Sequence, residues 1–338
     1  MEETCWPDRE WEPRDLPRSL AERVDAIQQA AAKIGSYALF ATVRGSVVLE
    51  HGCVAGAVGV QSVRKALMNA LLGRAVAEGR LDLESTMEQL GIDDVPPALT
   101  ADEKRATVRD CMMGRSGIYH PAAYEPLGSA AQRPPRGSHR PGEHWLYNNW
   151  GFNVLATILK QAVGLDSFRA FDEWFARPMR MQDFDPMACS ELFEDASQHP
   201  AYLFDLSARD LARFGHLYLC RGRWAGSRLL SDDWIARSLH PHSPATHGYE
   251  AYATAFGWMW WVMRPELLGG VPSYAALGGS GHGVFMIPDL QAVIVHRNDG
   301  EATAPGWSDI VPVLVSTAEL CRAVGSMPRR KGALEPAG

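Results

Sequence analysis

The sequence predicts an α/β fold in which both ends of the chain build one lobe and a mainly helical lobe is inserted between them. Three observations lead to this prediction. Strand-like runs occur within the first 51 residues, helices and loops then continue to about residue 240, and strand-like runs return from residue 256. We therefore expect residues 1–61 and 240–338 to form the α/β lobe and residues 62–239 to form the helical lobe.

The first elements of the α/β lobe are a helix and two strands. Residues 1–18 are rich in proline and charge, and we expect them to run over the surface. Residues 19–33 have the apolar spacing of a helix. Two apolar runs follow, 37–44 and 47–51, which are typical of strands joined around Gly45.

The inserted lobe begins with a predicted helix. Apolar residues recur every three or four positions from Ser62 until Gly79, which is a common helix end. Residues 152–163 and 208–219 show the same periodicity, and Gly164 follows the first of these two segments. The middle of the chain is therefore expected to be mainly helical.

Strands dominate the last part of the chain. The predicted strands are residues 256–263, 274–278, 284–287 and 292–296. A final helix is expected over residues 310–324, where the spacing of apolar residues is again helical.

Composition limits the classes of function. The chain has 338 residues, is 46% hydrophobic and carries a formal net charge of −7, so it can bury a large core. A negative charge without a basic cluster argues against nucleic acid as a partner. Residues 1–6 are acidic and lack an apolar segment, and no run approaches about 18 apolar residues. We therefore expect no signal peptide and no membrane partner.

Cysteine and histidine usage bears on location and on metals. The six cysteines are scattered and form neither a disulfide framework nor a CxxC metal motif. His240, His242 and His247 lie around a proline, which is more typical of a surface loop than of a metal site. We expect a cytoplasmic protein with reduced thiols, no metal and no cofactor. The sequence makes no prediction of the oligomeric state.

The most informative motif is the Ser-Val-Arg-Lys segment at residues 62–65, the one Ser-x-x-Lys of the chain. Residues three apart on a helix are neighbours, so we expect the Lys65 amine beside the Ser62 hydroxyl. Lysine is rare here, with five residues against 28 arginines, and a desolvated lysine can lose its proton whereas arginine cannot. The pair is a candidate nucleophile and base. Alternatively, Ser62 is a helix N-cap or the match is due to chance.

Tyr147 and Asn149 form a second candidate pair, in the one Tyr-x-Asn of the chain. They follow a Pro-Gly turn signal at residues 141–142 and precede the helix predicted from residue 152. Polar side chains in a loop that enters a helix can project into a cleft. The alternative is that Tyr147 is a half-buried aromatic residue and Asn149 a helix cap.

Five landmarks follow one another along the chain. They are residues 62–65 (SVRK), 111–117 (CMMGRSG), 141–149 (PGEHWLYNN), 207–215 (SARDLARFG) and 256–261 (FGWMWW). In this order the chain resembles the serine β-lactamase-like and penicillin-binding-protein-like superfamily. That superfamily contains class C β-lactamases, D-alanyl-D-alanine peptidases, related esterases and the hydrolase of the linear 6-aminohexanoate dimer. The resemblance spans roughly residues 36–323.

The resemblance implies both a fold and a reaction. The fold is an antiparallel sheet flanked by helices with an inserted helical lobe, and the reaction is acyl transfer through an ester on Ser62. Lys65, with a pKa lowered by burial, would take the Ser62 proton. Tyr147 would relay a proton to the leaving group, with its own pKa lowered by a neighbouring cation. Asn149 would orient Lys65 or the substrate carbonyl.

The third motif of the superfamily, Lys-Thr-Gly or a relative, falls here on Ala276, Leu277 and Gly278. Lactamases and peptidases hold a substrate carboxylate at this point with a cation and a hydroxyl, and neither Ala276 nor Leu277 supplies one. We therefore expect weak or no β-lactamase activity. The backbone role of Gly278 can persist, and N–H groups of Ser62 and of a residue near Gly279 would form the oxyanion hole.

Two further features allow more than one interpretation. Residues 278–282 (GGSGH) resemble a nucleophile elbow, but His282 stands where that motif needs glycine. His282 is instead a candidate for substrate contact, or a satisfied polar residue beside a turn. Trp258, Trp260 and Trp261 are candidates for an apolar acyl pocket or for the core. We expect a mixture, because neighbouring strand residues face opposite sides.

Three functions of different classes fit these residues. The first is a serine hydrolase that acts on a small ester or amide. The second is an acyltransferase of the same fold that passes the acyl group to an alcohol or amine. The third is a non-catalytic ligand-binding protein, against which the joint presence of Ser62, Lys65, Tyr147 and Asn149 argues.

Overall fold

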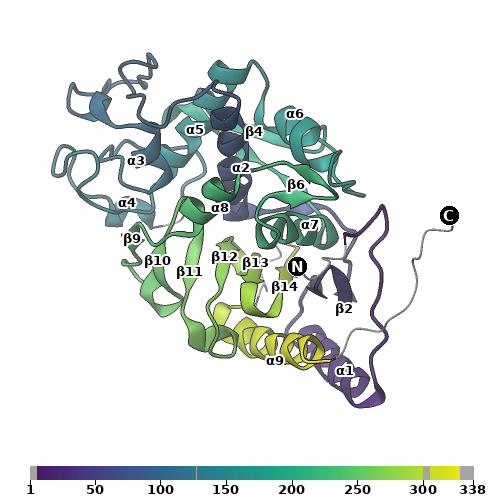
Figure 1. The fold of residues 1–338 in the computed structure, drawn as a ribbon. Coiled ribbons are helices and arrows are strands. Elements are labelled where there is room, and N and C mark those ends of the chain that lie inside the picture. The colour runs from purple at the N-terminus through teal and green to yellow at the C-terminus, as the bar shows by residue number, and fades with distance from the viewer. Residues whose placement is uncertain (1–5, 127, 300–304, 328–338) are drawn as a thin grey trace, which may run out of the picture.

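One eight-stranded antiparallel sheet joins the two ends of the chain (Figure 1). The computed structural model describes residues 6–126, 128–299 and 305–327. The sheet strands are β1 (Ala38–Val43), β2 (Ser46–Gly52), β9 (Ser243–Pro244), β10 (Ala253–Phe256), β11 (Trp261–Met263), β12 (Tyr274–Leu277), β13 (Gly283–Ile287) and β14 (Ala292–Arg297). Their order is β2-β1-β14-β13-β12-β11-β10-β9, so the N-terminal hairpin pairs with the last strand.

Helices cover both faces of this sheet (Figure 1). These helices are α1 (Arg18–Lys33), α7 (Ala208–Leu219) and α9 (Trp307–Gly325). Helices α1 and α9 contact each other on one face, and α7 lies on the other face. Neighbouring strand residues point to opposite faces. In β13, Phe285 packs against Trp307 of α9, whereas Val284 faces Gly215 of α7. Burial on both faces explains why β13 is a continuous apolar run.

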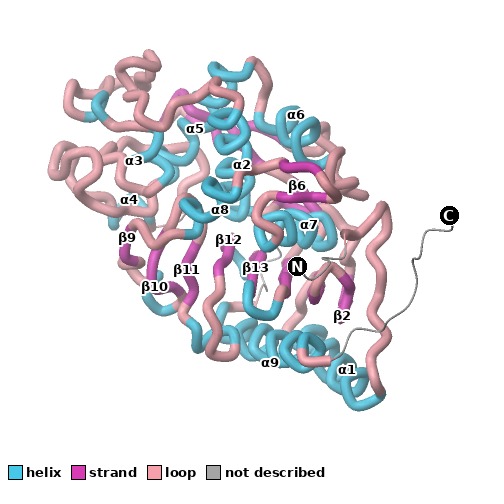
Figure 2. The backbone as a smooth tube through the Cα atoms, viewed as in Figure 1, coloured by secondary structure: helices cyan, strands magenta, loops and turns pink. Residues whose placement is uncertain are grey.

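The remaining elements form the second lobe (Figure 2). Its helices are α2 (Arg64–Ala77), α3 (Val108–Met112), α4 (Ser129–Gln132), α5 (Asn149–Val163), α6 (Ser167–Phe171) and α8 (Asp232–Leu239). Its short strand pairs are β3 (Val58–Gly59) with β6 (Asp205–Leu206), β4 (Ser190–Glu194) with β5 (Ser197–Leu203), and β7 (Arg223–Trp224) with β8 (Ser227–Arg228). Helix α2 contacts α5 and α6, which places it at the centre of the lobe.

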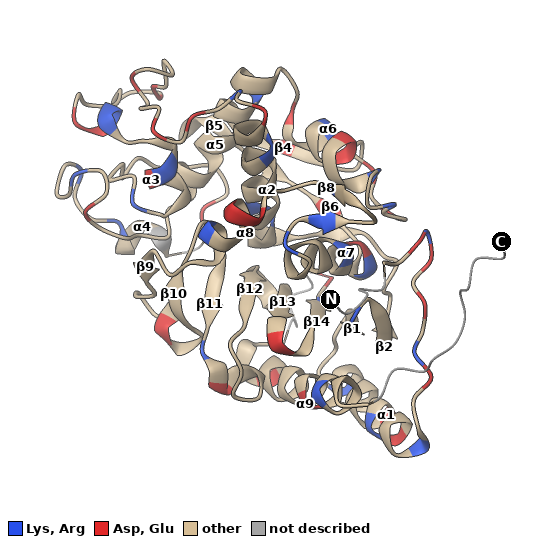
Figure 3. Cartoon of the chain, viewed as in Figure 1, with Lys and Arg blue, Asp and Glu red and all other residues tan. Residues whose placement is uncertain are grey.

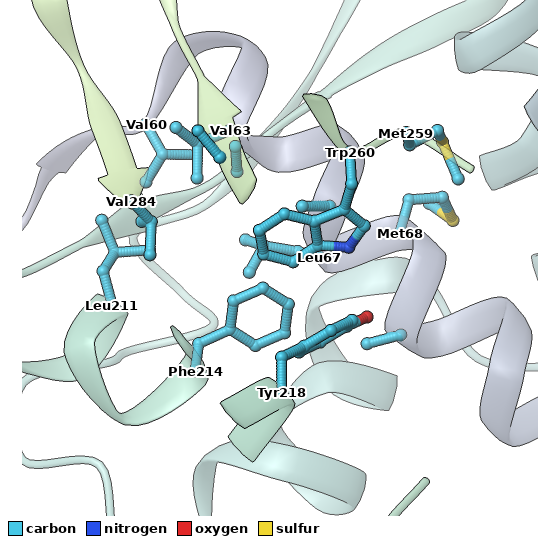
Figure 4. Close-up of a cluster of buried hydrophobic side chains, with 14 of the residues drawn as sticks. Val60, Val63, Leu67, Met68, Leu211, Phe214, Tyr218, Met259, Trp260 and Val284 are labelled. Carbon is cyan, nitrogen blue, oxygen red and sulfur yellow. The ribbon is translucent and has the colours of Figure 1, made fainter. Parts of the chain in front are cut away.

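Apolar packing holds the start of α2 against α7 and the sheet (Figure 4). Val63 and Leu67 lie beside Phe214 and Trp260, and all four side chains are fully buried. The ring centroid of Trp260 lies 6.0 Å from that of Phe214 and 4.6 Å from that of Tyr218. Because α2 is enclosed in this way, the residues at its N-terminal end have a well-defined position.

A buried amide ties α2 to the neighbouring helices. Asn69 accepts hydrogen bonds from the Tyr218 hydroxyl at 2.6 Å and from the Trp234 indole at 3.2 Å. Its amide nitrogen donates to Ser238 at 3.0 Å and to the carbonyl of Trp258 at 3.1 Å. A buried polar group that is fully satisfied in this way selects one rotation of the helix about its axis.

The prediction of one strand over residues 256–263 is wrong. Strands β10 and β11 form a hairpin instead. The Gly257 N–H donates to the Trp260 carbonyl across 2.8 Å, and Met259 has a φ of 60°. The aromatic residues favour a strand, and methionine rarely adopts a positive φ, so nothing in the local sequence indicates the turn.

The lobe boundaries stay a prediction. All eight strands of the sheet come from residues assigned to the α/β lobe, but α7, from the predicted helical lobe, packs against this sheet. Residues 6–17 run over α7, where Arg213 donates to the carbonyls of Pro7 and Arg9.

Charged residues of both signs are distributed along the whole fold (Figure 3). Several form ion pairs, such as Arg209 with Asp183 at 2.6 Å. Among the helices that the structure describes, none combines the length and the apolar character needed to cross a lipid bilayer.

Candidate active site

Ser62 and Lys65 lie together at the start of α2. A single 3-10 turn, η1 (Gln61–Val63), leads into the helix, and the Lys65 Nζ donates a hydrogen bond to the Ser62 Oγ across 2.9 Å. The neighbour relation predicted from their spacing is therefore present. The Ser62 hydroxyl caps neither η1 nor α2, so the N-cap alternative does not hold.

Lys65 is buried among aromatic rings. Its side chain is 2% exposed, and its Nζ lies 4.7 Å from the ring centroid of Tyr147 and 5.2 Å from that of Phe152. Burial lowers the pKa of Lys65 well below its usual range, and the positive charge of Arg64 lowers it further. A lysine with a lowered pKa can exist as the free amine and accept a proton from Ser62.

Tyr147 completes a group of three around the serine. The Ser62 hydroxyl and the charge of Arg64 both lower the pKa of Tyr147. Burial has the larger effect, so the net pKa is raised above the ordinary value of 10.0. The expectation of a lowered tyrosine pKa is therefore wrong. Tyr147 stays a protonated hydroxyl at neutral pH and is suited to donate a proton rather than to act as a phenolate.

Asn149 begins α5 and does not bond to Lys65. Asn148 caps this helix instead, since its side chain accepts from the Trp150 N–H at 3.1 Å. The Asn149 amide nitrogen donates to the carbonyl of Tyr124, and its Oδ1 has no hydrogen-bond partner within the described residues. Orientation of a substrate carbonyl by Asn149 stays a prediction.

Gln61 and Tyr124 are site residues that the sequence did not indicate. Both have a positive φ, 51° and 59°, in a region that side chains other than glycine rarely adopt. The Tyr124 hydroxyl donates to the Gln61 Oε1 across 2.5 Å. Gln61 directly precedes Ser62, so this bond helps to set the backbone at the candidate nucleophile. No local pattern signals it, because the two residues lie 63 positions apart.

The end of strand β12 touches the segment that carries Ser62. A Cβ atom built on Gly278 would lie 2.9 Å from the carbonyl oxygen of Val60 and 3.0 Å from the Cβ of Gln61. Only glycine permits this approach without displacement of the neighbouring chain. Gly278 therefore places the end of β12 directly against the segment that carries Ser62, and its role in substrate binding stays a prediction.

Two backbone N–H groups beside this contact are available to a ligand. Gly278 is not one of them, since its N–H donates to the His282 carbonyl across 2.7 Å. The N–H groups of Ser62 and Gly279 have no acceptor within the residues that the structure describes. Gly279 begins the short turn η6 (Gly279–Gly281), directly after the glycine that contacts the Ser62 segment. These two groups are the candidate oxyanion donors.

The third-motif position is apolar in the structure as well. Ala276 is buried, and Leu277 lines a small apolar cavity with Phe285, Trp307 and Leu314 beneath α9. Neither residue presents a cation or a hydroxyl that could bind a substrate carboxylate.

His282 is buried beside the η6 turn. The Arg297 Nε donates to its Nδ1 across 3.1 Å, and burial, together with that cation, lowers the pKa of His282 to about 3. His296 donates to the Gly281 carbonyl at 2.8 Å and so supports the same turn. This arrangement fits the interpretation of His282 as a satisfied polar residue, and its contact with substrate stays a prediction.

All three tryptophans are buried, with exposed fractions of 1% for Trp258, 0% for Trp260 and 3% for Trp261. Trp261 also stacks on Tyr249 at 4.7 Å and on Tyr147 at 5.5 Å between ring centroids. A place in an acyl pocket stays a prediction, and the half-buried Tyr249 is a further aromatic residue beside Tyr147.

The histidines of residues 240–247 do not converge on a metal site. His242 stacks on Trp258 and bonds to the carbonyl of Arg237 at 2.8 Å, whereas His247 stacks beside Trp145. Over the described ranges of the chain, no group of three or more His, Cys, Asp or Glu residues is placed to hold a metal ion.

Known proteins share this fold. A family model described as Beta-lactamase matches residues 24–296. The sequence has no significant match among curated proteins.

Solved structures resemble the chain at low identity. A provisionally assigned 6-aminohexanoate-dimer hydrolase from Bacillus anthracis has a TM-score of 0.69 and 19% identity, over 96% of this chain and 90% of that one. A penicillin-binding protein homologue from Caulobacter crescentus has a TM-score of 0.68 and 16% identity, over 91% and 99%. EstCE1, described as a hydrolase with promiscuous acyltransferase activity, has a TM-score of 0.62 and 16% identity, over 89% and 98%. The predicted fold class is confirmed.

Proposed function

The chain belongs to the β-lactamase family, and on this premise we propose that it is a serine hydrolase that cleaves a small ester or amide through an acyl-enzyme on Ser62. One observation carries the proposal. The buried Lys65 Nζ lies 2.9 Å from the Ser62 Oγ, with a pKa lowered by burial and by Arg64. That pair supplies a nucleophile and a base in direct contact.

Acylation begins at the serine hydroxyl. The Ser62 Oγ forms a bond to the substrate carbonyl carbon while its proton passes to the free amine of Lys65. The carbonyl oxygen becomes an oxyanion, which the N–H groups of Ser62 and Gly279 are available to stabilise. One donor of this kind typically contributes about 3 kcal/mol to the transition state.

The leaving group then departs with a proton. The bond between the carbonyl carbon and the leaving oxygen or nitrogen breaks, and the Tyr147 hydroxyl donates its proton to that atom. Lys65, now an ammonium 4.7 Å from the Tyr147 ring centroid, returns a proton to the phenolic oxygen directly or through water. Water attacks the acyl-enzyme in a second cycle, in which the same groups act in reverse order and release the acid.

The substrate class follows from what the third-motif position lacks. Ala276 and Leu277 present no cation and no hydroxyl, so we propose weak or no activity on β-lactams. The aromatic side formed by Trp261 and Tyr249 suits an apolar acyl or leaving group.

Acyl transfer to an alcohol or amine is a second candidate. The likeness to EstCE1, described as a hydrolase with promiscuous acyltransferase activity, favours it. The chemistry is shared up to the acyl-enzyme, and only the acceptor differs. Product analysis with and without added alcohol or amine separates the two reactions. A cytoplasmic location, the absence of a nucleic-acid or membrane partner and the absence of a cofactor are further proposals from sequence.

A labelling experiment tests the nucleophile. Wild type and Ser62→Ala are exposed to a fluorophosphonate probe, and intact mass is measured. We expect one adduct on wild type and none on the variant, followed by turnover in an ester and amide panel. An adduct on both proteins would assign the nucleophile elsewhere. No adduct on either would favour a non-catalytic binding protein.

A further inference from the structure

Arg64 is a buried cation directly beside Lys65. Its side chain is 1% exposed, and it reaches from α2 toward α5 and β5. Its Nη2 donates to the Oδ1 of Asn153 across 3.1 Å, and its guanidinium carbon lies 4.5 Å from the ring centroid of Tyr202 and 5.9 Å from that of Tyr124. All of these partners are neutral groups.

No carboxylate neutralises this guanidinium. Arg64 forms no ion pair with any residue that the structure describes, and Glu125, the residue after Tyr124, is bound by Arg133 at 2.5 Å. Tyr202 and Tyr147 keep their protons, because burial raises the pKa of Tyr202 to about 12 and raises that of Tyr147 as well. Buried charges are normally paired, so an unpaired arginine at this depth needs a reason.

The position of the unpaired charge supplies that reason. Arg64 and Lys65 are neighbours at the buried start of α2, and the positive charge of Arg64 acts on Lys65, since like charges removed from water repel strongly. Arginine keeps its proton at any useful pH, so the repulsion is relieved only when the lysine loses its own. A cation next to a buried lysine is a known means of activating that lysine. Ser62, Tyr147 and Phe152 are the other groups that face Lys65, and none of them carries a compensating negative charge.

We propose that Arg64 is a positioning residue for the reaction, whose buried and unneutralised guanidinium favours the uncharged amine of Lys65 and so keeps the base ready for the Ser62 proton. This inference rests on the proposed role of Lys65 as the base. Among the described residues the contacts of Arg64 are with Asn153, Tyr124 and Tyr202, none of which supplies a reacting atom.

The charge state of Lys65 can be measured directly. The chain has five lysines, so 13C labelling at the lysine ε-carbon yields few signals, and Lys65→Met identifies the one of interest. Its chemical shift is followed against pH in wild type and in two variants. Arg64→Met removes the cation. Asn153→Asp keeps the arginine and places a carboxylate on the atom that now accepts its hydrogen bond at 3.1 Å.

Both variants are expected to move the Lys65 titration midpoint to higher pH, by about one unit, the scale on which a nearby charge acts. A purely structural Arg64 predicts no such shift in Arg64→Met, because the carboxylate added in Asn153→Asp also favours a charged Lys65 by itself. Arg74→Met serves as the matched control, because Arg74 lies on the same helix, is partly exposed and pairs with Glu78. Its midpoint should equal that of wild type.

An unchanged midpoint in either folded variant would overturn the proposal, also when only one of the two variants folds. The measurement needs no substrate and no turnover. It can therefore fail while Ser62 is still labelled by the fluorophosphonate, which would leave the proposed function standing. If Ser62 is not labelled but the midpoints move, the effect of Arg64 on Lys65 is confirmed while the proposed function fails, since Lys65 is then not a catalytic base.

Discussion

The hydroxyl of Tyr124 donates a hydrogen bond to the side chain of Gln61, the residue before the candidate nucleophile. Both residues adopt a left-handed backbone that costs about 1–2 kcal/mol outside glycine. The carbonyl of Tyr124 also accepts from the Asn149 amide, so the loop is held from both sides. The backbone that orients Ser62 therefore depends on a contact from a distant part of the chain.

Tyr124→Phe is expected to slow fluorophosphonate labelling of Ser62 about fivefold, because it removes one hydrogen bond worth about 1 kcal/mol at a strained backbone. Adding Gln61→Gly should restore most of the rate, since glycine adopts a positive φ without assistance. Labelling rates of the single and double variants, measured by intact mass, test this. A Tyr124→Phe rate equal to that of wild type would show that the bond does not position Ser62.

Lys65→Met should be more stable than wild type at pH 7. The pKa of Lys65 is lowered in the folded state, whereas the unfolded chain keeps the ordinary value of 10.5. Between these two values the unfolded state binds more protons, so the free energy of unfolding of wild type rises with pH. Methionine does not titrate. The difference in free energy of unfolding between Lys65→Met and wild type should therefore shrink as the pH approaches 10.5.

Urea unfolding of both proteins at a series of pH values measures this difference. Other titrating groups cancel in the comparison, because they are common to the two chains. A gap that stays constant with pH, or a wild type that is the more stable protein at pH 7, would contradict a lowered lysine pKa.

Tyr147→Phe should slow the turnover of substrates with poor leaving groups more than that of substrates with good ones. The hydroxyl is placed to protonate the leaving atom, a step typically worth 10²–10⁴ in rate, and a nitrophenolate leaves without that proton. Turnover of matched alkyl and nitrophenyl esters measures the effect, and equal losses on both would remove the proton-donor role. Because burial raises the tyrosine pKa above 10.0, wild-type rates should rise with pH as Lys65 deprotonates and show no decline below that value.

Gly278→Ala should lower both the labelling rate, by at least about tenfold, and the melting temperature. Its Cβ would lie 2.9 Å from the Val60 carbonyl oxygen and from the Cβ of His282, and would push strand β12 away from Ser62. Gly59→Ala is the matched control, because the added carbon would meet only the Asp205 carboxylate at 3.6 Å, an ordinary contact. If both variants behaved alike, the close approach at Gly278 would not be the cause.

Local spacing was enough to predict part of this protein. The pairing of Ser62 with Lys65 follows from the helical repeat, which brings residues three apart together whatever surrounds them. Strands from both chain ends and helices between them also follow from apolar periodicity, and the sheet contains those strands. The split of residues 256–263 into two strands did not follow, because the turn depends on a positive φ at Met259.

The tertiary structure decided whatever depends on burial and on distant contacts. The pKa of Tyr147 is raised rather than lowered because desolvation outweighs the charge of Arg64. The burial of a side chain depends on residues far away in the sequence, so the residues next to it do not predict it. The bond between Tyr124 and Gln61, and the lack of any counter-charge around Arg64 among the described residues, likewise arise from chain segments that only folding brings together. The sequence by itself determined which groups can react, and the packing around them determined their protonation and orientation.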